Sequence, residues 1–486
     1  MANGLRNTWR RLARGQLTLA DLWLLLPPLG LLIVLNLSPV RPYDFWWHLR
    51  TGQIIVESGS IPTIDLFSFT RSGLPWINQS WLAQVALYLL YRAGDLPLVI
   101  FGHALVIAAG YALIELACLR SSGGQARAAA GATLMAALLS LFNWNVRPQS
   151  ASFLLFGAVV FVLESHRVRG GRIAWALPLI FALWVNLHAA FAFALLLVGI
   201  YVLACLAEGR LLAAGVAALL ALSLNPGGPL GIVRYVLGLS QSKAVQDFVL
   251  EWMPLNVRTI DGQLFLAAVV LLIVIAYRRR LTLPPYLFVG LLTFGGLSLY
   301  SRRVEPWFGM VAAPAFAQAF ARQGEPEGLT ARAGNPRLNA SLAALLVLLT
   351  LLSLPWWRPF LPLPPRWRSY LAVAETPVQA TQELCRAGQG TRLFNDMGYG
   401  SYVIWACREV PVFIDTRIEL YPSAVWREYF LVSEGQFGWE AVLARYGINT
   451  ILANKERQKL LVAAAQASGA WRTIYEDDQT ALLALK

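Results

Sequence analysis

Charged residues are scarce in this chain. Only 14% of its 486 residues are charged, and the mean hydropathy is +0.54, whereas a soluble domain carries roughly a quarter charged residues. The shortage is uneven, because residues 1–355 carry 26 Lys and Arg against 14 Asp and Glu, while residues 356–486 carry 14 against 13. These numbers exclude an ordinary soluble protein. They predict a polytopic membrane protein that ends in a soluble domain.

Cysteine is also rare, with four in the chain. Cys118 and Cys205 end apolar segments and are expected to be small buried residues. Cys385 and Cys407 both lie in the tail, and a disulfide between them is left open because spacing alone does not bring two Cα atoms together. The chain also lacks a P-loop, a dinucleotide fingerprint and a clear metal-ligand spacing. No cofactor is therefore predicted, although a divalent cation at Asp44 and Asp65 remains an option.

The net charge of +13 is explained by arginines in short loops between apolar segments, following the positive-inside rule, and not by nucleic-acid binding. Arg6, Arg10, Arg11 and Arg14 precede a first apolar segment at 19–37 that has no small-residue cleavage site, so we expect a retained first helix with a cytoplasmic N-terminus. Ten further segments are expected at 96–118, 128–143, 149–165, 173–186, 190–207, 211–224, 263–277, 283–300, 304–321 and 338–355.

The segment 81–92 decides the topology. If it crossed alone, every later arginine-rich loop would lie outside, and about 12 residues are too few for an untilted crossing. We therefore expect an interfacial or re-entrant helix, or the first half of a broken helix that continues at 96. The result is a plasma-membrane protein with about eleven transmembrane helices and an extracytoplasmic C-terminal domain. The predicted divisions are a membrane domain at 1–355 with a first outer loop at 39–80, a linker at 356–374 and a soluble domain at 375–486.

The first outer loop concentrates polar and aromatic residues. Asp44 stands just outside the first apolar segment beside Trp46 and Trp47, and an apolar wall favours the protonated form of a carboxyl and so suits a general base. The alternative is a solvated Asp within an interfacial belt of Trp. His48 follows one helical turn later, either as an acid–base partner of Asp44 or as a structural hydrogen-bond partner. Gly52 is expected to end this helix.

Other candidates lie at the same predicted outer ends. Asp65 either binds the acceptor or is a turn residue after a proline. Arg147, Arg302 and Arg303 could bind a lipid phosphate by bidentate hydrogen bonds, or could be ion-paired structural residues. Three more candidates are His188 as an accessory donor, Asn186 beside it, and Glu251 in the 225–262 loop. That loop has room for an amphipathic helix at 229–240, and it either gates the lipid donor, holds the acceptor or is a plain linker.

The tail alternates strand-like and helix-like segments, which predicts a small α/β domain. The expected strands are 392–396, 411–415, 450–454, 471–477 and 480–486, and the expected helices are 376–387, 423–433, 438–446 and 456–467.

The string D-F-W-W-H-L-x-x-G from Asp44, followed by I-P-x-x-D-x-F-S-x-T, resembles a bacterial branch of the GT-C membrane glycosyltransferases. It is similar to the mannosyl- and aminoarabinose-transferring members, and the tail strings N-D-x-x-x-G-x-Y and I-D-x-R-x-E-x-Y accompany the same branch. The resemblance implies an inverting transfer from a polyprenyl-phosphate sugar to a lipid, glycan or protein acceptor at the outer membrane face. It makes Asp44 the base that deprotonates the acceptor hydroxyl and Asp65 the second acidic position.

Two other classes remain open. A transporter or scaffold would favour inverted repeats and ionisable residues in mid-membrane, and the sequence has neither. A lipid-linked glycan polymerase or ligase would rely on large outer loops with Arg and His and would need no acidic base in the first loop.

Overall fold

The computed structural model describes residues 17–204, 208–241, 250–322, 335–388 and 390–486. The N-terminal arginines 6, 10, 11 and 14, and Cys205, lie outside these residues. The chain forms two compact units, described separately below. The helical unit comprises Met1–Ser38, Pro97–Pro229 and Leu250–Pro362, and the mixed unit comprises Pro39–Leu96, Leu230–Val249 and Leu363–Lys486.

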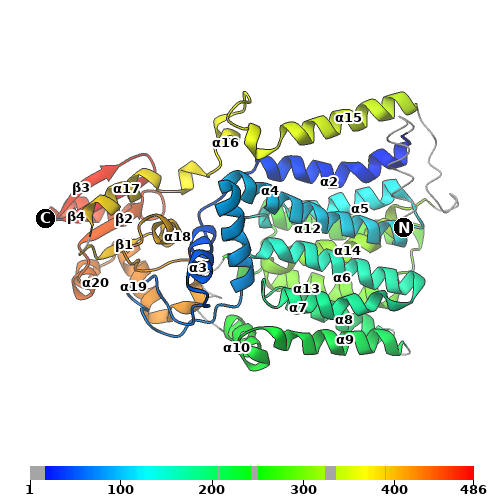
Figure 1. Ribbon diagram of the computed structural model, residues 1–486, viewed down its shortest axis with the longest axis horizontal. Helices are drawn as coiled ribbons and strands as arrows, with labels where there is room; N and C mark the ends of the chain where they lie inside the picture. The colour runs from blue at the N-terminus through cyan, green and yellow to red at the C-terminus, as the bar shows by residue number, and fades with distance from the viewer. Residues whose placement is uncertain (1–16, 205–207, 242–249, 323–334, 389) are drawn as a thin grey trace. The chain divides into compact units, whose positions relative to one another are not determined.

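The helical unit is a bundle of apolar helices (Figure 1). Each of the eleven predicted apolar segments overlaps one of its helices. They are α2 (Leu19–Leu37), the second half of α4 (Trp81–Ser121), α5 (Ala126–Leu138), α6 (Gln149–Arg169), α7 (Ala176–Trp184), α8 (Phe191–Ala204), α9 (Gly209–Ala221), α12 (Ile260–Arg279), α13 (Pro285–Tyr300), α14 (Glu305–Phe320) and α15 (Pro336–Leu352).

Among the described residues, four helices are long and apolar enough to cross a membrane: α2, α4, α6 and α12. The bent pair of α9 and α10 (Gly228–Gln241), which meets at 91°, would make a fifth. The remaining apolar helices have 10–17 residues when the turn Arg172–Trp175 is counted with α7, so the predicted number of eleven crossings stays a prediction. The amphipathic helix expected at 229–240 is confirmed as α10.

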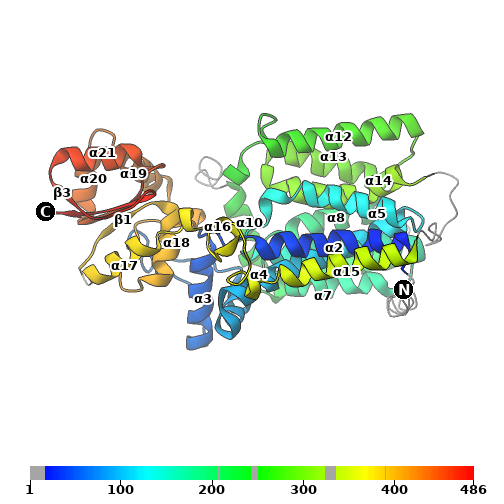
Figure 2. The ribbon, with the colours of Figure 1, turned by 90° about the horizontal axis from the view of Figure 1, so that it is seen from above.

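The centre of the bundle is α14, in which almost every residue is buried. It packs against α5 and α13, while α2 and α15 lie side by side in both views (Figures 1 and 2). Small residues allow close approach elsewhere, because a Cβ on Gly157 of α6 would come within 2.4 Å of the Gly110 carbonyl oxygen of α4. Such small-residue contacts are typical of helices packed in membranes.

Helix α4 is broken where the two units divide. Gly94 and Asp95 have non-helical dihedral angles, and Asp95 has a φ of 55°. The segment 81–92 is therefore the first half of a broken helix, which is one of the predicted alternatives.

The mixed unit contains a four-stranded sheet in the order β1-β2-β4-β3. Its strands are β1 (Leu393–Asn395), β2 (Thr450–Asn454), β3 (Trp471–Glu476) and β4 (Thr480–Leu485), with β1 parallel to β2 and the other pairs antiparallel. Its helices are α3 (Phe45–Ser58), the first half of α4, α16 (Pro365–Arg368), α17 (Val378–Ala387), α18 (Met397–Ala406), α19 (Ser423–Ser433), α20 (Trp439–Tyr446) and α21 (Lys459–Ser468). The predicted α/β tail is confirmed.

The prediction of a strand at 411–415 is wrong, because these residues form no strand of the sheet. Val412 instead forms an isolated parallel bridge with Ser68 of the first loop. The amide side chain of Asn395 accepts from Phe413 N at 2.9 Å and donates to Ile414 O at 2.8 Å, so a side chain satisfies backbone groups that a sheet neighbour would otherwise pair. The loop 39–80, which we expected to belong with the membrane helices, thus packs in the same unit as the tail.

Two further details differ from the sequence-based expectation. Helix α3 continues through Gly52 and ends at Gly59, whose φ of 68° suits a left-handed cap. In the predicted linker 356–374, Arg358 is fully buried and donates to the carbonyl oxygens of Asn36 and Ser38 at the end of α2. Cys385 and Cys407, left open from the sequence, are paired as a disulfide with a Cα–Cα distance of 5.4 Å.

Candidate functional site

The first candidate group surrounds Asp44 in the mixed unit. Asp44 is the residue before α3, its carbonyl oxygen accepts from His48 N at 3.2 Å, and its side chain is half-buried. The next three residues are aromatic and buried: Phe45, Trp46 and Trp47. Asp44 therefore stands at the edge of an apolar cluster where a carboxylate keeps some access to solvent.

The tail holds the backbone on both sides of Asp44. Thr416 Oγ1 accepts a hydrogen bond from Trp47 Nε1 at 3.0 Å and donates to the Tyr43 carbonyl oxygen at 3.3 Å. Ser401 Oγ accepts from Trp47 N at 3.2 Å. The string I-D-x-R-x-E-x-Y, which contains Thr416, had no role assigned from the sequence. The hydrogen bonds of Thr416 show that this string holds the backbone at the start of α3.

His48 is buried and faces the first half of α4. Its Nδ1 lies 3.1 Å from Gln84 Nε2, and its ring lies against the Trp47 ring with 3.5 Å between centroids. These contacts suit a structural role for His48.

Asp65 has the contacts of a turn residue. Its carboxylate accepts from Phe67 N and Ser68 N, both at 3.1 Å, and from Ser68 Oγ at 2.6 Å. It also forms an ion pair with Arg417 at 2.7 Å, and both side chains are fully buried. The structural alternative stated for Asp65 describes these contacts better than acceptor binding does.

Arg417 is the centre of this buried network. It also pairs with Asp415 at 2.6 Å, and its guanidinium lies 4.9 Å from the ring centroids of both Phe67 and Trp76. Burial disfavours the charged form, but Asp415, Tyr421 and Asp65 outweigh it and hold the pKa of Arg417 above its ordinary value. Arg417 is the Arg of the tail string I-D-x-R-x-E-x-Y, but neither that string nor its place after a strand-like segment gave it a role.

The second candidate group lies in the helical unit and contains all three predicted phosphate-binding arginines. Arg147 pairs with Glu251 at 2.8 Å, and Arg302 pairs with Asp261 at 2.5 Å. The Arg303 guanidinium lies 5.3 Å from the ring centroid of Trp252.

Backbone contacts hold the Glu251 loop in place. Arg302 N donates to Met253 O at 3.0 Å, and Ser301 Oγ donates to Glu251 O at 3.3 Å. Burial raises the pKa of the Glu251 carboxyl, but the guanidinium groups of Arg147, Arg303 and Arg302 hold the net pKa below its ordinary value. Glu251 is therefore an anion that occupies the arginine cluster in this structure.

His188 and Asn186 hold neighbouring turns of the same unit. Trp184 Nε1 donates to Ser152 Oγ at 2.9 Å, and Ser152 Oγ lies 3.0 Å from His188 Nδ1. Ala190 N also donates to His188 Nδ1, at 3.3 Å. With Nδ1 acting as an acceptor, the ring proton of neutral His188 is on Nε2. Asn186 accepts from Asn225 Nδ2 at 3.3 Å.

Sequence reasoning missed Gln149 and Asp261. Gln149 is in the first turn of α6, its side chain is 1% exposed, and neither of its amide atoms has a hydrogen-bond partner within the described part of the chain. A buried amide without a partner is unusual and marks a site for a polar ligand or water. Its position directly after Arg147 and Pro148 was the available signal.

The structure brings no metal site together from the residues that it describes. No group of three or more His, Cys, Asp or Glu side chains has suitable geometry among them. Asp65, one of the two suggested ligands, is engaged by Arg417.

These features define a class by fold: a bundle of apolar helices combined with a unit in which a long first loop packs with a C-terminal α/β tail. No protein-family model and no curated protein matches the chain. Solved structures of an oligosaccharyltransferase, AglB from Archaeoglobus fulgidus, have a fold similar to that of this chain. The apo form aligns with a TM-score of 0.54 and 10% identity over 95% of this chain and 74% of that chain.

Two other AglB structures give the same result. A complex with an inhibitory peptide and a dolichol-phosphate has a TM-score of 0.55 and 11% identity over 92% of this chain and 72% of that chain. A form tethered with an acceptor peptide containing the NVT sequon has a TM-score of 0.53 and 11% identity over 95% and 74%. At this identity the likeness establishes the fold of the chain.

Proposed function

We propose that the chain is a membrane glycosyltransferase of the GT-C class. It moves a sugar from a polyprenyl-phosphate donor to an acceptor at the outer face of the plasma membrane, with inversion. The observation that carries the proposal is the likeness of fold to an oligosaccharyltransferase over 92–95% of the chain. The first-loop string that begins at Asp44 supports the same class.

Asp44 is the general base. It is half-buried, it stands at the start of a helix, and the backbone around it is held by Thr416. Its carboxylate takes the proton of the acceptor hydroxyl while the hydroxyl oxygen forms a bond to the anomeric carbon of the donor. The bond from that carbon to the phosphate oxygen breaks, and its electron pair leaves with the phosphate.

The arginines stabilise the leaving phosphate. Arg147, Arg302 and Arg303 supply guanidinium donors, which suit phosphate by charge-assisted hydrogen bonding. Arg147 and Arg302 must exchange Glu251 and Asp261 for the ligand. His188 Nε2–H is an accessory donor, and the buried amide of Gln149 supplies a further polar contact. In this proposal Asp65 is a supporting residue and does not touch the substrate.

A second candidate is the transfer of an oligosaccharide from a lipid to a peptide. It is supported by two of the solved structures of similar fold, one tethered with an acceptor peptide and one in complex with a dolichol-phosphate. Both candidates share a lipid-phosphate leaving group and the base at Asp44, and they differ in the donor and the acceptor.

The test uses full-length protein in lipid with a panel of radiolabelled polyprenyl-phosphate sugars and one lipid-linked oligosaccharide. Transfer or donor hydrolysis is compared between wild type and Asp44→Asn. We expect turnover of one donor class in wild type, no turnover in Asp44→Asn, and unchanged donor binding. Turnover that persists in the variant would remove Asp44 as the base, and failure of wild type to bind any donor would favour a transporter or scaffold.

A further inference from the structure

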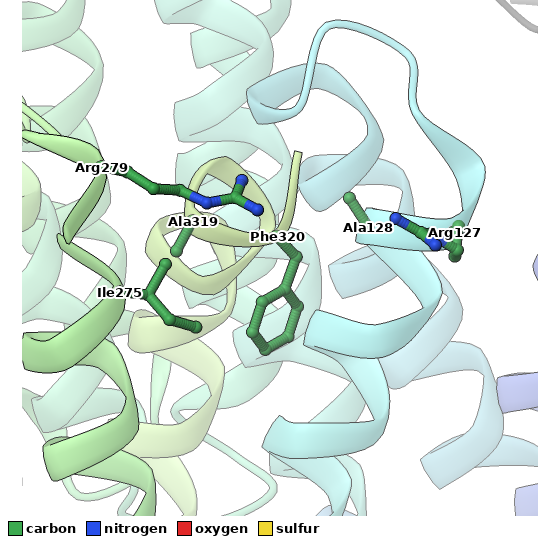
Figure 3. A pocket seen from close by; sticks show the side chains of 6 residues that line it. All are labelled: Arg127, Ala128, Ile275, Arg279, Ala319 and Phe320. Atoms are coloured by element: carbon green, nitrogen blue, oxygen red, sulfur yellow. The ribbon is translucent and has the colours of Figure 1, made fainter. Parts of the chain in front are cut away.

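A basic pocket lies between three helices of the helical unit. It has a volume of about 280 Å³ and is formed by α5, α12 and α14 (Figure 3). Its lining residues are Arg127, Ala128, Ile275, Arg279, Ala319 and Phe320. The two arginines provide its polar groups, and the other four side chains form an apolar floor.

The two arginines come from different helices. Figure 3 shows Arg279 of α12 and Arg127 of α5 on either side of the pocket, with the Arg279 guanidinium above Phe320. Arg279 Nη1 donates to the Ala321 carbonyl oxygen at 2.5 Å, which leaves its other nitrogen donors for a ligand. None of the described residues that line the pocket is acidic. Two cations that line one pocket repel each other, so an anion between them is stabilising.

The surrounding backbone is held in place and favours an anion. Gln125 Nε2 donates to Arg322 O at 3.0 Å, and Arg322 N donates to Gln125 Oε1 at 2.8 Å, so the start of α5 is fastened to the chain after α14. Arg127 lies in the first turn of α5, where the helix dipole disfavours a cation and favours an anion.

A membrane-crossing α12 would put the pocket at the level of lipid headgroups. Helix α12 is long and apolar enough to cross a membrane, and Arg279 is its last residue. The end of a spanning helix lies at the boundary between acyl chains and headgroups. An apolar floor below two arginines therefore matches a ligand with a phosphate above an acyl chain.

We propose that this pocket binds the phosphate of an anionic phospholipid headgroup. The site is separate from the proposed catalytic groups and does not depend on the proposed function. Each arginine near a membrane surface contributes a factor of roughly five in affinity, so removal of both should weaken binding about 25-fold.

The test measures lipid retention by the full-length protein. Purified protein is delipidated, titrated with phosphatidylglycerol or phosphatidylcholine, and analysed by native mass spectrometry. The variants are Arg127→Gln, Arg279→Gln and the double variant. Arg278→Gln is the matched control, because Arg278 precedes Arg279 on α12, is exposed, and does not line the pocket.

We expect the double variant to lose most phosphatidylglycerol binding, with phosphatidylcholine binding unchanged and the Arg278→Gln control like wild type. A double Arg→Lys variant keeps both charges and should retain part of the preference, which separates loss of binding from misfolding. Equal retention of phosphatidylglycerol by wild type and by the double Gln variant would overturn the proposal that this pocket binds the lipid phosphate. A competition arm with inorganic phosphate distinguishes the sources: a pocket that binds phosphate but shows no preference for the anionic lipid would overturn the lipid proposal.

Discussion

Asp65 and Arg417 form an ion pair of 2.7 Å in which both side chains are fully buried. One residue belongs to the first loop and the other to the tail, so the pair joins two distant parts of the sequence inside the mixed unit. Asp415 completes the network at 2.6 Å from Arg417. The loop that carries the proposed base is thus held by a residue of the C-terminal domain.

Replacement of Arg417 by Gln should destabilise the mixed unit strongly. Removal of one partner of a buried pair leaves an uncompensated buried charge, here on Asp65 and Asp415, and costs about 3–5 kcal/mol. Thermal unfolding and limited proteolysis of the 60–80 region should both report the change. The matched control is Arg386→Gln, since Arg386 pairs with Glu383 on the surface, where the effect should stay below about 1 kcal/mol. Similar melting temperatures for the two variants would show that the Asp65–Arg417 pair does not hold the loop.

Gly52 is required for the close contact between α3 and the first half of α4. A Cβ at this position would come within 2.0 Å of the Gln84 carbonyl oxygen, and backbone cannot move aside as a flexible side chain can. Gly52→Ala should therefore cost about 1–3 kcal/mol despite the better helix propensity of Ala. Gly30→Ala in α2, where nothing lies within 4 Å, is the control and should be neutral or stabilising in the same melting experiment. A stabilised Gly52→Ala protein would contradict the contact.

The helices were the most predictable part of the fold. Long apolar segments identified α2, α6 and α12 because a membrane helix needs little beyond length and hydropathy. The break in α4 was one of the stated alternatives, because 81–92 is too short to cross a membrane alone and a separate crossing would put the later arginine-rich loops outside.

The tertiary partners could not be predicted in this way. The 411–415 segment has a strand pattern, yet it pairs with the first loop, because a pattern reveals burial but not the neighbour. The sequence singled out Asp65 and Arg147 as candidate site residues. The sequence left open whether each binds a ligand or another side chain, because their partners Arg417 and Glu251 lie far away in the chain.

Stability should depend on pH through Glu251. Burial opposes its charge, but Arg147, Arg303 and Arg302 lower its pKa in the folded state below the ordinary value of 4.5. The carboxylate therefore contributes stability that is fully present above the pKa of the unfolded chain and is lost as the pH falls through the lower folded-state pKa. The melting temperature of wild type, compared with that of Glu251→Gln, should have a constant difference above about pH 5.5 and converge as the pH falls below the ordinary pKa. If the difference in melting temperature between wild type and Glu251→Gln grew as the pH fell, the charged form of Glu251 would not be the stabilising one, and its pairing with the arginines would be excluded.

The Arg147–Glu251 pair offers a test of the phosphate-binding role that a purely structural pair would fail. If Arg147 binds the donor phosphate, Glu251 competes with the ligand for the same guanidinium. Arg147→Gln should then weaken donor binding about 10-fold or more, since a charge-assisted hydrogen bond contributes about 1.5–3 kcal/mol. Glu251→Gln should bind the donor as tightly as wild type or more tightly, because the competing anion is gone while Arg147 remains.

Donor affinity is measured by titration of each variant in lipid, with the melting temperature as a check on folding. If the pair is only structural, the two variants should lose stability together and neither should change donor affinity in a folded sample. A loss of donor affinity in Arg147→Gln without a loss in Glu251→Gln therefore distinguishes an arginine that exchanges Glu251 for the ligand from a fixed ion pair.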